Sequence, residues 1–110
     1  MSREEKNVVW LGNSLDALQA FPKVVRADLG ADLRRLQIGE MPLDSKPMRT
    51  VGPGVRELRA RDRNNQFRAM YVVRKGSEIV VLHCFIKKSR TTSKADINTA
   101  KERLKAFDGK

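Results

Sequence analysis

Residues 55–88 read VRELRARDRNNQFRAMYVVRKGSEIVVLHCFIKK, and they give the clearest indication of the fold. Two segments, 67–74 and 78–86, are rich in Val, Ile, Phe and Tyr, and a third, 55–61, alternates apolar and charged residues over its last four positions. Turn-forming residues separate them, at 63–66 and at Gly76 and Ser77. Apolar segments of this length between such turns are typical of antiparallel strands joined by hairpins. We therefore expect a three-stranded antiparallel meander at the centre of the protein.

The register expected from these turns gives the sheet two different faces. The expected pairs are Leu58–Tyr71, Ala60–Ala69, Ala69–Cys84, Tyr71–Leu82 and Val73–Val80. These small and apolar side chains share one face, which we interpret as the core. Because neighbours along a strand point to opposite faces, His83 is expected on the face opposite Cys84.

The opposite face is basic. It is expected to carry Arg59, Arg61, Arg68, Met70, His83, Phe85 and Lys87. In the expected register Arg61 lies directly across from Arg68, and two like charges in that position destabilise a sheet unless an anion lies between them. Guanidinium groups bind phosphate through paired hydrogen bonds. We therefore interpret this face as a phosphate-binding site.

The flanking segments complete an α+β fold. Residues 8–11 are expected to form a strand. Ser14 is expected to cap a helix that runs through Phe21, and Pro22 is expected in the first turn of a second helix that ends near Gly39. Residues 40–54 lack periodicity and are expected to be a loop. Ser93 and Asp96 form a capping-box pattern before a last helix. We expect about four antiparallel strands, an N-terminal helical hairpin on the core face and a C-terminal helix at a sheet edge or beside the basic face.

Composition limits the functional classes. The chain of 110 residues is expected to form one domain, residues 1–110. It carries a formal net charge of +10, and residues 55–94 contribute eleven Lys or Arg against three Asp or Glu. This density favours a nucleic-acid partner. No apolar run is long enough to span a bilayer, so a cytoplasmic protein without a membrane partner is expected. A single cysteine and a single histidine argue against a disulfide and against a Cys/His metal centre.

Each candidate site residue also has a structural interpretation. The basic residues, which extend to Lys88 and Arg90 after the last strand, can be a solvated charged surface or an RNA-binding face. His83 can be a half-buried structural histidine or a proton carrier beside the arginines. Aromatic residues make up only 5% of the chain, so extended stacking of bases is not expected, although Phe85 can stack on one base.

The strings VRELR (55–59), FRAMYVV (67–73) and IVVLHCFIKK (79–88), followed by a helix, resemble the RelE/HigB toxin superfamily. The resemblance is greatest to its phage-derived HigB-like branch. It implies a RelE-like fold, a metal-independent endoribonuclease that cuts mRNA in the ribosomal A site without a cofactor, and an antitoxin that often contains a helix-turn-helix domain. It also implies that Arg59, Arg68 and either Lys87 or Lys88 serve the reaction. The general acid and base remain open between a lysine, His83 and groups of the RNA or ribosome.

The sequence therefore leaves three functions to distinguish. The first is a ribosome-dependent mRNA endonuclease, with Arg59, Arg68, Lys87 and His83 as catalytic candidates. Arg61, Lys88, Arg90 and Phe85 are then RNA-contact candidates. The second is a ParE-like toxin of the same fold that inhibits gyrase. The third is a non-catalytic basic module that binds nucleic acid.

Overall fold

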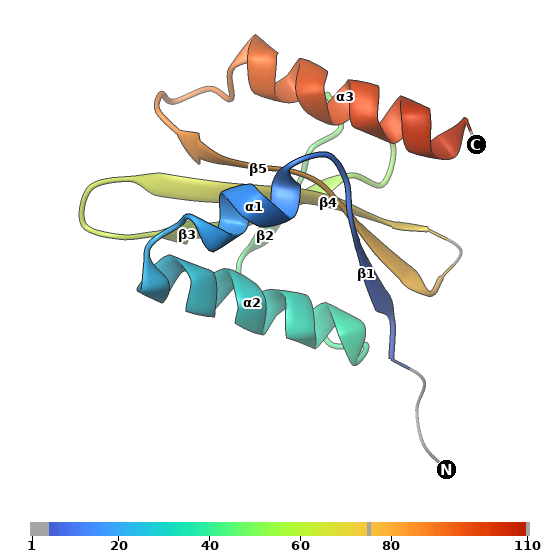
Figure 1. Cartoon of the computed structure of the whole chain (residues 1–110), viewed down its shortest axis with the longest axis horizontal. Coiled ribbons are helices and arrows are strands. Elements are labelled where there is room, and N and C mark those ends of the chain that lie inside the picture. The colour runs from blue at the N-terminus through green and yellow to red at the C-terminus, as the bar shows by residue number, and fades with distance from the viewer. Residues whose placement is uncertain (1–4, 75, 110) are drawn as a thin grey trace.

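The computed structural model describes residues 5–74 and 76–109, and within them the chain forms an α+β fold (Figure 1). The strands are β1 (Asn7–Trp10), β2 (Ser45–Pro47), β3 (Arg56–Arg61), β4 (Gln66–Arg74) and β5 (Glu78–Lys87). The helices are α1 (Ser14–Gln19), α2 (Lys23–Gln37) and α3 (Lys94–Asp108). The expected fold class is confirmed. Among the helices of the described residues, none has the length and hydropathy to span a membrane.

The sheet has five strands in the order β1-β5-β4-β3-β2, one more than expected. The central meander of β3, β4 and β5 is antiparallel as predicted, whereas β1 lies parallel to β5. The additional strand, β2, pairs with β3 through Ser45–Leu58 and Pro47–Arg56. It lies in the segment expected to be a loop, because three residues containing a proline give no strand pattern, and an edge strand tolerates proline.

Helices α1 and α2 cover one face of the sheet, as predicted (Figure 1). The buried cluster on this face joins α1 and α2 to β3, β4 and β5, and its largest side chains include Leu29, Leu58 and Phe67. The rings of Phe21 and Phe67 pack with their centroids 4.8 Å apart. This contact joins the connection between α1 and α2 to β4, the middle strand of the sheet.

Helix α3 covers the other face and creates a second core that the sequence did not predict (Figure 1). Its buried residues include Ala100 and Leu104 of α3, Met70 and Val72 of β4, and Phe85 of β5. Met48 and Val51, from the segment expected to be a loop, and Val55, which was expected to begin the first strand of the meander, complete this cluster. Helix α3 was expected at a sheet edge or beside the basic face. It packs on the face predicted to be basic, and the second core beneath it was not expected. Its packing leaves only one end of this face for the basic side chains.

The first hairpin is shifted by two residues from the expected register. Arg59 pairs with Arg68 and Arg61 with Gln66, so the expected opposition of Arg61 and Arg68 is wrong. The cause is a tight turn: the Asp62 carboxylate accepts hydrogen bonds from the amides of Asn64 and Asn65. Because a shift of two preserves the alternation of side chains, every arginine remains on the predicted face.

A β-bulge between β4 and β5 changes the second hairpin. Ala69 pairs with Cys84 as expected, but Tyr71 pairs with Val81 and Val73 with Ile79. Leu82 is the extra residue at this irregularity, which shifts the alternation of β5 by one. Val80 and Leu82 therefore lie in the second core under α3, not in the core under α1 and α2 as expected. Cys84 lies in the core under α1 and α2, as predicted.

The helix starts were predicted correctly for α3 but not for α1. Ser93 caps α3, and its hydroxyl accepts a hydrogen bond from the amide of Asp96. Ser14 is instead the first residue of α1, and its buried hydroxyl donates to the carbonyl oxygen of Val81 on β5. Pro22 precedes α2 as its cap residue rather than lying in its first turn.

Candidate functional site

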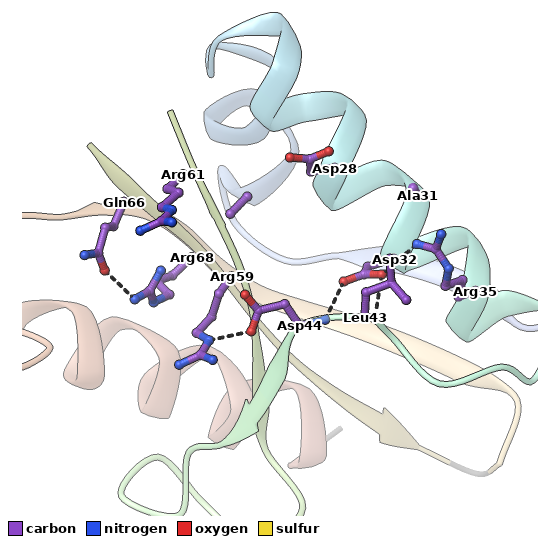
Figure 2. A pocket seen from close by; sticks show the side chains of 11 residues that line it. Asp28, Ala31, Asp32, Arg35, Leu43, Asp44, Arg59, Arg61, Gln66 and Arg68 are labelled. Carbon is purple, nitrogen blue, oxygen red and sulfur yellow. Dashed lines mark hydrogen bonds and ion pairs between the residues drawn. The ribbon is translucent and has the colours of Figure 1, made fainter. Parts of the chain in front are cut away.

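A pocket of about 710 Å³ lies beside the second half of β3, which β2 does not cover (Figure 2). Its walls are the ends of β3 and β4, helix α2 and the segment that precedes β2. The lining residues are Asp28, Ala31, Asp32, Arg35, Leu43, Asp44, Arg59, Ala60, Arg61, Gln66 and Arg68. Three of them are Arg59, Arg61 and Arg68. Arg59 and Arg61 are two residues apart on β3 and Arg59 pairs with Arg68, so these three residues share one side of the sheet, as predicted.

Arg68 is the most constrained of the three arginines. Its side chain is 7% exposed, and its Nε lies 3.3 Å from Oε1 of Glu57. Its Nη1 donates to the carbonyl oxygen of Phe67, and its Nη2 donates to Oε1 of Gln66 (Figure 2). Burial lowers the pKa of Arg68, but an arginine pKa starts so high that the group remains charged at neutral pH. The pocket therefore holds a positive charge in a fixed orientation.

The carboxylate beneath Arg68 belongs to Glu57, which was not among the predicted site residues. Glu57 is fully buried, and its Oε1 also lies 3.6 Å from Nζ of Lys46 on β2. Neither carboxylate oxygen accepts a hydrogen bond within the described part of the chain. The sequence contains one sign that Glu57 belongs to the site. Glu57, Arg59 and Arg61 are spaced two residues apart, so their side chains point to the same face of β3.

Arg59 is oriented by the segment that enters β2. Its Nε donates to Oδ1 of Asp44 at 2.8 Å, and its backbone amide donates to the Asp44 carbonyl oxygen (Figure 2). Asp32 of α2, which is 4% exposed, accepts hydrogen bonds from the backbone amides of Leu43 and Asp44. Helix α2 therefore fixes Arg59 through two successive carboxylates. Asp32 and Asp44 were not predicted as site residues, because their segments are distant from β3 in the sequence.

Lys87 ends β5 opposite Gln66 and extends the arginine set to a third strand. Partial burial, followed by the positive charges of Arg68 and Lys46, lowers the pKa of the Lys87 amine. We call Lys46, Arg59, Arg68 and Lys87, which lie around Glu57, the basic cluster. Arg61 lies at its solvent side, exposed at the end of β3.

His83 is not part of the basic cluster. It lies under α3, where its Nε2 is 2.7 Å from Oδ1 of Asp96 and its Nδ1 is 3.5 Å from a guanidinium nitrogen of Arg103. Its ring stacks on Phe85, with centroids 5.0 Å apart. These contacts join β5 to α3 and favour the structural interpretation of His83 over the role of proton carrier.

The remaining predicted residues occupy different environments. Phe85 is 7% exposed in the second core, so the expectation that it stacks on a base does not fit its position. Lys88 and Arg90 are exposed after β5. Lys87 and Lys88 also line a second pocket of about 410 Å³ at the start of α3. The basic surface therefore continues from the basic cluster towards Arg90.

Two other kinds of chemistry, a cysteine nucleophile and a metal centre, find little support in the described residues. Burial raises the pKa of the Cys84 thiol to about 12, so Cys84 remains protonated at neutral pH and is a poor nucleophile. Among residues 5–74 and 76–109, no three His, Cys, Asp or Glu side chains form a group that could hold a metal ion.

Residues 16–105 match the family model described as Phage derived protein Gp49-like (DUF891). The matched segment runs from α1 into α3 and includes every residue of the pocket and the basic cluster. None of the curated proteins matches the chain.

Proposed function

Since the chain belongs to the family of phage-derived Gp49-like proteins, a toxin-like family in the context of the RelE and HigB toxins, we propose that it is a HigB-like toxin of a type II toxin–antitoxin pair. Its activity is metal-independent cleavage of mRNA in the A site of the ribosome, and its partner is an antitoxin with a helix-turn-helix domain. The observation that carries this proposal is the convergence of Arg59, Arg61 and Arg68 on one pocket.

The pocket suits a reaction in which the ribose 2′-hydroxyl attacks the adjacent phosphate. Negative charge then grows on the non-bridging oxygens of the phosphorane, and the 5′-oxygen of the next nucleotide leaves. Fixed donors near these oxygens stabilise the transition state more than mobile donors do, because they need no rearrangement. Arg68 and Arg59 supply such donors, since Glu57 and Asp44 hold them in place.

Arg61, Lys88 and Arg90 are assigned to contacts with the RNA or ribosome. They are exposed around the pocket and after β5, so they can meet phosphates on either side of the cleaved bond. The basic cluster holds one lysine amine of lowered pKa and no histidine. A site with so few proton carriers needs groups of the ribosome or the RNA to complete proton transfer, so cleavage is expected to require ribosomes.

Expression of the wild-type chain in bacteria, with mapping of mRNA 5′ ends, tests this function. The expected result is growth arrest with mRNA cut at codons inside translated frames. Arrest with intact mRNA and a DNA-damage response would instead select a ParE-like gyrase inhibitor. Normal growth together with salt-dependent RNA binding in vitro would select a non-catalytic binding module.

Lys87 is the proton carrier in this proposal, and the Lys87→Arg variant tests it. Arginine keeps the positive charge but does not deprotonate in the accessible pH range. Cleavage on ribosomes is expected to fall about 100-fold, with RNA affinity unchanged. For the wild type, the rate should rise with pH until the Lys87 amine is deprotonated, below the ordinary lysine value of 10.5 because its pKa is lowered. The variant should lose this rise.

The matched control is Lys101→Arg, the same exchange at an exposed position on α3. It should keep both the wild-type rate and its pH dependence. A Lys87→Arg protein that cleaves with the wild-type pH profile would remove Lys87 from proton transfer.

A further inference from the structure

Glu57 holds Arg68 in the proposed reaction, but this role does not explain why its buried carboxylate lacks hydrogen bonds from the described residues. It is fully buried, yet neither oxygen accepts a hydrogen bond within the described residues. Burying a carboxylate is costly unless charges and hydrogen bonds compensate it. Here the compensation comes from Lys46 at 3.6 Å and Arg68 at 3.3 Å. Two cations of the basic cluster therefore balance the charge of Glu57, but its carboxylate oxygens lack hydrogen bonds from the described residues.

Glu57 contacts only one edge of the Arg68 guanidinium group. Nε is the atom nearest to Glu57, and it makes no hydrogen bond to a described residue. Nη1 and Nη2 donate to two neutral oxygens, the Phe67 carbonyl and the Gln66 amide. Neutral acceptors are weaker partners for a guanidinium than a phosphate oxygen is. Arg68 is therefore balanced by a carboxylate on one edge and remains available to a phosphate on the other.

The Lys46 side chain likewise contacts Glu57 and is also partly exposed to solvent. It lies directly across from Glu57 in the pairing of β2 with β3. Its side chain is 41% exposed, so its amine can reach a phosphate outside the sheet as well as the carboxylate. The ion pair is long for a charge-assisted hydrogen bond, which leaves the amine free to change partner.

We propose that Glu57 is an internal counter-ion of the basic cluster, which competes with the RNA phosphate for Lys46 and Arg68. This inference rests on the proposed function. It adds Lys46 to the residues that bind RNA. It also makes Glu57 a positioning residue, which holds two cations at the pocket and lowers the affinity of the pocket for RNA.

The Glu57→Gln variant of the full chain tests this inference. The probe is a labelled single-stranded RNA oligonucleotide, and its affinity is measured at several salt concentrations. Affinity is expected to increase about ten-fold, because the competing charge is removed from beside the phosphate. The logarithm of affinity should fall more steeply with the logarithm of salt, by about 0.7 for each additional RNA phosphate that the protein neutralises. Cleavage per bound RNA should fall at least ten-fold, because both cations lose their fixed positions.

Glu102→Gln is the matched control, since it changes the net charge equally at an exposed position on α3. It should leave RNA affinity within two-fold of wild type. Unchanged or weaker RNA binding by a folded Glu57→Gln protein would overturn the inference, as would an equal gain in the Glu102→Gln control.

Two further measurements keep the test decisive. If Glu57→Gln does not fold, Glu57→Asp retains the charge but withdraws the carboxylate, and RNA should bind at least two-fold more tightly. Unchanged or weaker binding by Glu57→Asp would then overturn the inference. Tighter RNA binding without mRNA cleavage by the wild type would retain Glu57 as a counter-ion and reject the nuclease function. The absence of RNA binding in every variant would reject both.

Discussion

Replacing Arg68 by alanine is expected to reduce mRNA cleavage by about 100-fold to 1000-fold and to abolish growth arrest. The variant loses a buried hydrogen-bond donor next to the phosphate. Of the two ion pairs described for Glu57, only the one with Lys46 then remains. Single-turnover cleavage of mRNA on ribosomes measures the rate, and growth after induction measures the toxicity.

The same exchange at Arg74 provides the control. Arg74 lies at the other end of β4 and pairs with Asp108 of α3 at the surface. Surface ion pairs of this kind contribute little stability, so Arg74→Ala should arrest growth as the wild type does. A thermal melt should show both variants folded at the assay temperature. Undiminished cleavage by folded Arg68→Ala would reject the proposed catalytic site.

Replacing Phe67 by alanine is expected to lower the free energy of unfolding by about 3–5 kcal/mol. Phe67 is 1% exposed, and its ring packs against Phe21 at the end of the helical hairpin. The substitution removes apolar area and leaves a cavity between the hairpin and the sheet. Urea or guanidinium unfolding followed by circular dichroism measures the change. Because small domains are only marginally stable, the variant should be partly unfolded at growth temperature and lose toxicity without any change in the pocket residues.

Phe107→Ala removes the same side chain from the last turns of α3, where it is only partly buried against the second core. Its effect should be smaller, about 1 kcal/mol. A loss below about 1 kcal/mol for Phe67→Ala would show that the contact between hairpin and sheet contributes little to stability.

Local sequence patterns were enough to predict which segments form the meander and which face carries the arginines. Alternation along a strand is a local property with a period of two, so the shared face of Arg59 and Arg61 can be deduced without knowing their partners. The first hairpin differs from prediction by two residues, and an even shift leaves every side chain on its face. The Ser93 cap of α3 was equally local, because the hydroxyl and the amide it binds are three residues apart.

How the two faces of the sheet are used became apparent only in the folded structure. A bulge at Leu82 moves part of β5 into a second core, and α3 covers that core together with His83 and Phe85. The basic cluster also depends on tertiary structure, because Lys46 reaches Glu57 only through the pairing of β2 with β3. Bulges, edge pairings and buried ion pairs join residues that are distant in sequence. Their free energies depend on packing that a local pattern does not contain.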